Sequence, residues 1–203
     1  MKVVTEAKTK DEAIQKALEE LKVNLEDIMY TQEKIKGKLF KADTIKITAY
    51  TKDEVIIFMK DFIKELVNNM GIEVSFESNI REDQFNIKMF SDNNAILIGK
   101  NARTMKSIEM ITKQRVQNEL GIRVRLFLDV ENYNDKRIKQ LERLAINTAR
   151  EVRNTKVEAV MDNMNSYERR IIHNKLTNFK GVTTTSEGEE PNRHIIIKPK
   201  EDK

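Results

Sequence analysis

The amino-acid sequence predicts an α+β fold made of three small domains. At 203 residues the chain is longer than one small domain needs. Helical and strand-like hydrophobic patterns alternate along it in three groups, and several of the predicted helices start with a residue typical of a helix N-cap. Because proline and glycine number only two and six, the boundaries between the groups are taken from changes of pattern rather than from linkers.

The first group, residues 1–50, reads as β-α-β-β. Residues 2–6 alternate as a short strand, and Thr9 with Glu12 three residues later has the pattern of a capping box. Apolar residues then recur at helical spacing, at Ala13, Ile14, Ala17, Leu18 and Leu21. The stretches "IMYTQEKIKGKLF" and "DTIKITAY" predict two strands that turn between Lys38 and Asp43.

The second group, residues 51–131, reads as α-β-β-α-α-β. Thr51 and Glu54 predict a capped helix that ends before Gly71. "IEVSFESN" and "QFNIKMF" alternate as a strand pair. They are followed by a short helix, a tight loop at Gly99, a longer helix that ends before Gly121, and the strand "IRVRLFLDV".

The third group, residues 132–203, reads as α-β-α-β-β. A long amphipathic helix covers "NDKRIKQLERLAINTAREVRNT", and "KVEAVM" over residues 156–161 predicts a strand. Asn165 as cap and Glu168 at the third helical position predict the start of the next helix. "VTTTS" and "RHIIIKP" read as strands joined by the turn "EGEEPN".

Composition excludes several classes of function and location. No apolar run approaches the roughly 18 residues of a membrane span, and no cysteine is present for disulfide or thiol chemistry, so we expect a cytosolic protein. Residues 1–90 carry 15 Lys and Arg against 17 Asp and Glu, whereas residues 91–203 carry 22 against 16. A basic C-terminal half attracts polyanions, although a run of charge can also be a solvated face and nothing more.

The loop at Gly99 is the first candidate for anion binding. Glycine lets a phosphate approach the backbone, and the following helix start brings unpaired N–H groups together with Lys100, Arg103 and Lys106. The alternative interpretation is a glycine that ends a helix beside a surface lysine.

Arg169 and His173 are the second candidate. Four residues apart on a helix, they share one face and can contact one ligand. Guanidinium and imidazole both suit phosphate oxygens, and Lys175 and Arg170 add positive charge nearby. The alternative is that Arg169 pairs with an acid while His173 packs partly buried. We expect no metal and no cofactor, because no second zinc ligand has matching spacing.

Residues 51–131 resemble the type II KH domain in element order, length and loop position. In that family a G-x-x-G loop clamps about four nucleotides, which implies the same role for Gly99, Lys100, Asn101 and Ala102. Ala102 replaces the usual second glycine. An alanine there disfavours a left-handed backbone and crowds the sugar-phosphate path, so we expect this loop to bind RNA weakly or to contact protein.

The C-terminal region resembles the R-x-x-x-H nucleic-acid-binding domain. The stretch "MNSYERRIIH", followed by "TTTSEGEEPNRHIIIKP", carries the signature arginine and histidine at Arg169 and His173. Arg193, after the turn, falls at a position that is usually basic in that family. The resemblance implies that these side chains grip the sugar-phosphate chain of a single strand.

The order of the three domains is similar to that of the bacterial Jag proteins, also called KhpB or SpoIIIJ-associated proteins. The resemblance is weakest over residues 1–50, where relatives have a more glycine-rich hairpin and "KIKGKLFKAD" contains only Gly37. The resemblance implies a cytosolic, non-catalytic protein that binds single-stranded RNA, with single-stranded DNA and a homo-oligomer left open. It also implies a small single-KH protein partner, an association with the YidC-type insertase, and a role in cell elongation or division.

Two other classes of function compete with this interpretation. A protein-interaction adaptor with vestigial RNA binding is favoured by Ala102. An enzyme would need His173 and Glu168 to act as an acid–base pair, and the sequence offers no second catalytic group.

Overall fold

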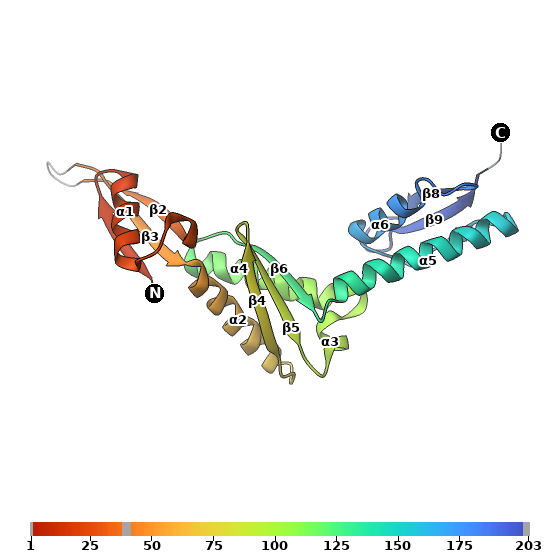
Figure 1. Cartoon of the computed structure of the whole chain (residues 1–203), viewed down its shortest axis with the longest axis horizontal. Coiled ribbons are helices and arrows are strands. Elements are labelled where there is room, and N and C mark those ends of the chain that lie inside the picture. The colour runs from red at the N-terminus through yellow and green to blue at the C-terminus, as the bar shows by residue number, and fades with distance from the viewer. Residues whose placement is uncertain (1, 38–41, 201–203) are drawn as a thin grey trace. The chain divides into compact units, whose positions relative to one another are not determined.

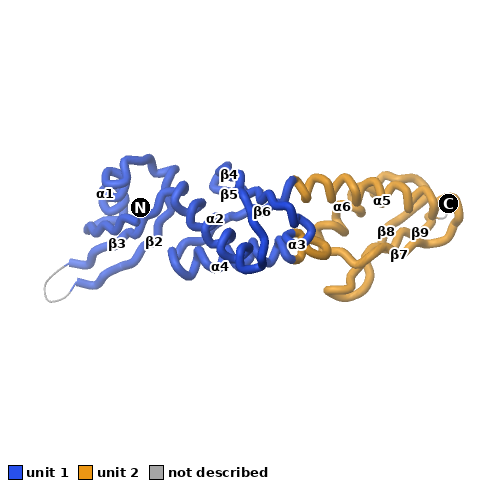
Figure 2. Tube along the Cα trace, turned by 90° about the horizontal axis from the view of Figure 1, so that it is seen from below, with its two compact units in different colours: residues 1–97, 104–131 blue, residues 98–103, 132–203 orange. Residues whose placement is uncertain are grey.

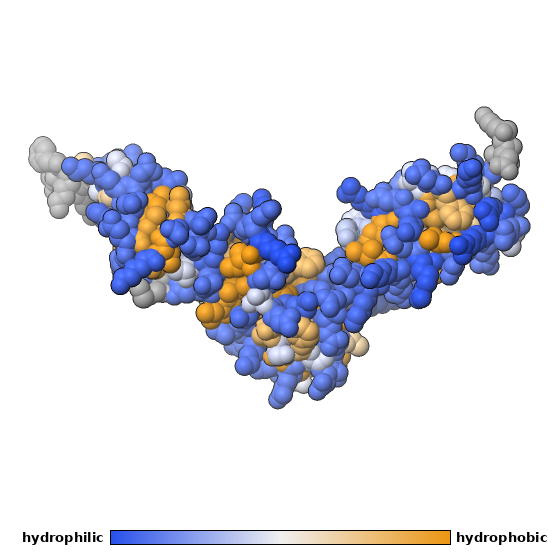
Figure 3. Space-filling view, viewed as in Figure 1, coloured by the Kyte–Doolittle hydropathy of each residue, from blue (hydrophilic) through white to orange (hydrophobic). Residues whose placement is uncertain are grey.

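The computed structural model of the chain (Figure 1) describes residues 2–37 and 42–200 and has the predicted α+β architecture. Helices alternate with three separate three-stranded sheets. The turn predicted between Lys38 and Asp43 lies largely outside the described residues. Most of the surface seen in Figure 3 is hydrophilic, with apolar side chains gathered in separate patches, which agrees with a chain that is 34% charged.

The N-terminal part is a β-α-β-β unit, as predicted. It consists of strand β1 (Val3–Ala7), helix α1 (Lys10–Leu21), a short 3-10 turn at Leu25–Asp27, strand β2 (Ile28–Ile35) and strand β3 (Thr44–Thr51). The strands pair antiparallel in the order β1-β3-β2, and α1 packs its apolar face against the sheet. The Thr9 hydroxyl accepts the Glu12 N–H at 3.3 Å, so the predicted cap starts α1.

The middle part follows the predicted α-β-β-α-α-β order. It runs through α2 (Lys52–Asn68), β4 (Ser75–Arg81), β5 (Gln84–Phe90), α3 (Asn94–Ile98), a 3-10 turn η2 (Lys100–Ala102), α4 (Arg103–Leu120) and β6 (Arg125–Val130). β5 is central, antiparallel to β4 and parallel to β6. A parallel pair needs a crossover connection, which α3, η2 and α4 supply. Thr51 and Glu54 form the predicted capping box of α2.

The C-terminal part is α-β-α-β-β, with α5 (Tyr133–Thr155), β7 (Ala159–Val160), α6 (Ser166–Leu176), β8 (Val182–Glu187) and β9 (His194–Pro199). The strands are antiparallel in the order β7-β9-β8. One core joins the helices to the sheet, from Leu141, Ala145, Ala149, Val152, Ile172, Leu176, Ile195 and Ile197 among others.

The strand predicted over residues 156–161 is wrong in length, because β7 contains only Ala159 and Val160. Lys156 ends α5 in a left-handed conformation with φ 61°, and its N–H bonds the Val152 carbonyl, so extended structure cannot begin there. Past β7 the chain still follows β9, since the Met161 N–H bonds the Ile195 carbonyl at 2.9 Å.

The described chain falls into two compact units (Figure 2). The first contains the residues up to 97 together with 104–131, and the second contains residues 98–103 together with those from 132 onward. Each predicted domain contains one sheet, but the N-terminal and middle parts belong to one unit. The division into domains at 1–50, 51–131 and 132–203 therefore stays a prediction. Among the described residues, none of the helices combines the length and apolar character required to span a membrane.

Candidate nucleic-acid interface

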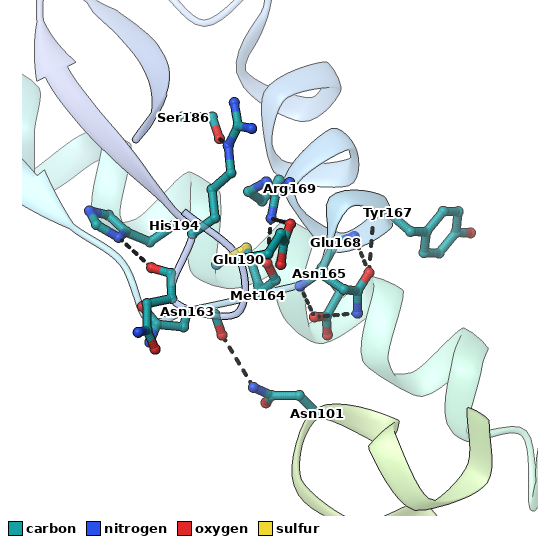
Figure 4. A network of polar contacts seen from close by, with 12 residues as sticks. Asn101, Asn163, Met164, Asn165, Tyr167, Glu168, Arg169, Ser186, Glu190 and His194 are labelled. Carbon is teal, nitrogen blue, oxygen red and sulfur yellow. Dashed lines mark hydrogen bonds and ion pairs between the residues drawn. The ribbon is translucent and has the colours of Figure 1, made fainter. Parts of the chain in front are cut away.

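Helix α6 is fixed at its start by the capping box that the sequence predicted. The Asn165 Oδ1 accepts the backbone N–H groups of Tyr167 and Glu168, both at 3.1 Å, and the Glu168 carboxylate accepts the Asn165 N–H at 3.2 Å (Figure 4). The other carboxylate oxygen of Glu168 accepts a hydrogen bond from Arg137 Nε of α5 at 2.8 Å. Glu168 is buried and anchors α6 to α5, so it does not act on His173 as the enzyme alternative required.

Arg169 is buried, and the expectation that it is exposed beside His173 is wrong. Its side chain is only 10% exposed, and one terminal NH₂ donates both to the Met164 carbonyl at 2.7 Å and to the Glu190 carboxylate at 2.9 Å. Figure 4 shows the guanidinium turned towards these two acceptors. The alternative that Arg169 pairs with an acid describes the structure. This side chain braces the turn between β8 and β9 against the segment that precedes α6.

His173 is exposed, one turn further along α6. Its Nδ1 lies 2.7 Å from the Thr184 hydroxyl of β8, and this bond fixes the plane of the ring. Whichever tautomer is present, Nε2 is left for an external partner. His173 therefore keeps the ligand-binding geometry that Arg169 lacks.

Arg193 is exposed and directly precedes β9. Like His173, it forms a hydrogen bond with a side chain of β8. Its Nε donates to the Ser186 hydroxyl at 3.0 Å. Thr184 and Ser186 are two residues apart, so their side chains leave one face of β8 about 7 Å from each other. Two hydroxyls of one strand thus hold the imidazole and the guanidinium on the same face.

Glu187, which follows Ser186 at the end of β8, projects from the opposite face of the strand. Glu187 accepts a hydrogen bond from the Lys198 ammonium at 3.0 Å, which holds the pKa of this carboxyl below its ordinary value. Because side chains alternate along a strand, the charge of Glu187 falls on the face opposite to Ser186. The acid therefore does not neutralise the face that carries His173 and Arg193.

The remaining cations predicted on α6 differ in their environment. Arg170 is exposed, and no ion pair involves it within the described part of the chain. Lys175 instead pairs with Glu142 of α5 at 3.2 Å, so its charge is partly neutralised. Sequence reasoning missed Tyr167, which is 57% exposed and lies three residues before Arg170 on the same helix face. The sequence did offer a signal for it, because Tyr167 lies three positions before Arg170 in a predicted helix, which places an aromatic ring next to a cation.

The loop at Gly99 has the backbone that glycine allows. Gly99 directly follows α3 and has φ 68° and ψ 176°, a region open essentially to glycine alone, so it ends the helix and also makes the tight loop. Asn101 and Ala102 are left-handed as well, with φ 53° and 59°. Asn101 donates to the Asn163 carbonyl at 3.2 Å (Figure 4).

Ala102 adopts the left-handed conformation although alanine disfavours it, at a cost of about 1–2 kcal/mol. The whole residue is only 5% exposed, so its methyl does not crowd an approaching phosphate, contrary to expectation. The exposed groups at the loop are Lys100 and Arg103, with Lys106 exposed one turn further along α4.

Replacing Ala102 by glycine should leave RNA affinity equal or higher. Glycine adopts a positive φ without strain, and the substitution leaves Lys100 and Arg103 in place. Fluorescence anisotropy with labelled single-stranded RNA measures the effect, with Ala13→Gly in α1 as a control for adding a glycine elsewhere. A clear drop for Ala102→Gly alone would mean that the backbone held by alanine is itself part of the binding surface.

In residues 2–37 and 42–200 the acidic and histidine side chains form no group that could hold a metal ion.

Comparison with known proteins places the C-terminal site within a recognised domain. Residues 139–199 match the family model of the R-x-x-x-H domain, and this range contains Arg169, His173 and Arg193. The RNA-binding protein KhpB of Clostridium symbiosum is 36% identical over 200 residues, which cover 96% of this chain and 90% of that protein. KhpB of Bacillus subtilis is 30% identical over 198 residues, 94% of each chain. KhpB of Lactiplantibacillus plantarum is 31% identical over 137 residues, which are 68% of this chain and 42% of that longer protein.

Proposed function

The chain belongs to the KhpB family of RNA-binding proteins, and we propose that it binds single-stranded RNA through the α6–β8 face of its R-x-x-x-H domain without catalysing a reaction. The observation that carries the proposal is the placement of His173 and Arg193 on neighbouring hydroxyls of β8. Both side chains are exposed, and both keep donors or acceptors that the protein does not use.

Each side chain of this face contributes a different contact. Arg193 uses only its Nε internally, so its terminal NH₂ groups are available to phosphate oxygens. His173 offers Nε2 from a ring held in place by Thr184. Beside this face, Arg170 adds an exposed charge on the adjoining side of α6, where the exposed ring of Tyr167 offers a surface on which a base can stack. Most of these contacts are to the backbone, so sequence preference should be modest.

The double substitution His173→Ala/Arg193→Ala should weaken RNA binding by about tenfold or more, because two polar contacts to phosphate are lost. Anisotropy titrations with several unrelated single-stranded RNAs should show similar losses. The control is Lys8→Ala/Lys22→Ala, which removes two exposed cations of the N-terminal part. Equal affinity of the double variant and the wild type would refute the proposed site and support the adaptor function.

A protein-interaction adaptor is the second candidate. Met110 on α4 is 65% exposed, and its neighbour Ile111 and Ile96 of α3 are exposed too. Such large apolar side chains on a surface favour contact with protein over contact with RNA. The two functions are compatible if the middle domain binds protein while the C-terminal domain binds RNA.

The wider cellular role rests on family resemblance alone. Under this proposal the protein resides in the cytosol, pairs with a small single-KH protein and is linked to a YidC-type insertase and to cell elongation or division. Purification of the tagged protein followed by identification of its partners tests these points separately from RNA affinity.

A further inference from the structure

Helix α5 carries a continuous basic and amide stripe on the side that it does not bury. The stripe consists of exposed residues spaced three or four apart along Tyr133–Thr155, namely Lys136, Lys139, Arg143, Asn147, Arg150 and Asn154. At 1.5 Å per residue it is about 27 Å long. Residues at this spacing share one face of a helix.

The stripe lies opposite the core face of the same helix. The buried positions of α5 are Leu141, Ala145, Ala149 and Val152. With 3.6 residues per turn, the stripe falls roughly half a turn away from them. Figure 1 shows α6, β8 and β9 all on one side of α5, so the described residues of its own unit leave the other side of this helix uncovered.

The charges of the stripe are not neutralised by the protein. Lys136, Lys139, Arg143 and Arg150 take part in no ion pair formed by the described residues. Four cations on other sides of the same domain are paired, Arg137 with Glu168, Arg169 with Glu190, Lys175 with Glu142 and Lys198 with Glu187, whereas Arg170 and Arg193 of the proposed single-strand site have no such pair among the described residues. The acids of α5 itself, Asp135, Glu142 and Glu151, fall on its flanks by helical spacing. The contrast sets this surface apart from an ordinary mixed-charge surface.

The composition of the stripe favours a duplex over a single strand as its ligand. It contains no aromatic side chain, and surfaces that bind single strands typically stack bases on aromatics. Double-stranded RNA is recognised by shape and by contacts to phosphate and 2′-hydroxyl groups. A straight row of cations and amide donors matches a rigid row of phosphates, and the lack of acids and large apolar groups disfavours a protein partner.

We infer that the outer face of α5 binds the phosphate backbone of an RNA duplex that flanks the single-stranded segment held at the α6–β8 face. The inference rests on the proposed function for the choice of RNA, but it concerns a separate surface. The protein then recognises a junction, with the single strand on one side of the C-terminal domain and the base-paired stem on the other.

The test compares two RNAs on the full-length chain. One is a single strand of about five nucleotides, and the other is a hairpin that carries the same segment as a tail. The variant Lys139→Gln/Arg143→Gln/Arg150→Gln should bind the short strand like wild type and the tailed hairpin at least about tenfold more weakly. The slope of log affinity against log salt for the hairpin should fall by about two to three, as expected for three lost phosphate contacts.

A matched control removes the same charge elsewhere, by Lys2→Gln, Lys8→Gln and Lys22→Gln in the N-terminal part, and should bind both RNAs like wild type. Equal hairpin affinity of the stripe variant and wild type, or an equal loss on both RNAs, would overturn the inference. If wild type fails to bind the short strand while the stripe variant still loses hairpin affinity, the proposed function is wrong and the duplex site stands.

Discussion

Replacing Glu168 by alanine should lower the local free energy of unfolding around α6 by about 3 kcal/mol, because the change leaves the mostly buried Arg137 guanidinium without an acidic partner and removes half of a capping box. The Glu168 carboxylate is 5% exposed and accepts hydrogen bonds from Arg137 Nε, from the Asn165 N–H and from the Asn165 side chain. Hydrogen exchange of the α6 amides in the full-length chain measures the effect, since a chain with several domains need not unfold in one step.

Glu142→Ala provides the matched control. Glu142 also connects α5 to α6, through Lys175, but both of these side chains are about a third exposed or more. A surface ion pair of this kind contributes about 1 kcal/mol or less. If the two glutamate variants destabilise α6 equally, burial is not what makes Glu168 important.

The features that sequence reasoning predicted correctly are those whose cause is local. Thr51 with Glu54 and Asn165 with Glu168 lie three residues apart and start their helices as capping boxes. The apolar periodicities likewise gave the order of helices and strands in all three parts. Such signals are complete within a few residues, so folding of the rest of the chain does not change them.

The features that were missed depend on residues distant in sequence. Arg169 pairs with Glu190, which is 21 positions away in the turn between β8 and β9. No local sequence pattern indicates that this turn lies next to α6. The Thr184 hydroxyl gains its role only when β8 lies beside α6, and the Ser186 hydroxyl only when the turn after β8 brings Arg193 back to this strand. The spacing of Arg169 and His173 correctly predicts neighbours on a helix, but spacing alone cannot tell which of the two faces the core.

Replacing Arg169 by alanine should cost about 2–3 kcal/mol of local stability around α6 and have a smaller effect on RNA affinity than His173→Ala/Arg193→Ala. The loss leaves the Met164 carbonyl, which is bonded at 2.7 Å in a buried setting, without its charged donor. Hydrogen exchange reports the first effect, and anisotropy well below the unfolding temperature reports the second.

Glu190→Ala separates the two partners of Arg169. The Glu190 side chain is 60% exposed, so losing its carboxylate should cost less than about 1 kcal/mol, whereas Arg169→Lys should restore part of the stability by donating to the Met164 carbonyl. If Arg169 has a structural role, the local stability around α6 should depend on having a hydrogen-bond donor at position 169 and hardly on the Glu190 carboxylate. The contrary outcome is that Arg169→Ala keeps full stability and loses more RNA affinity than His173→Ala/Arg193→Ala. In that case the guanidinium leaves Glu190 to bind phosphate, and its structural role is wrong.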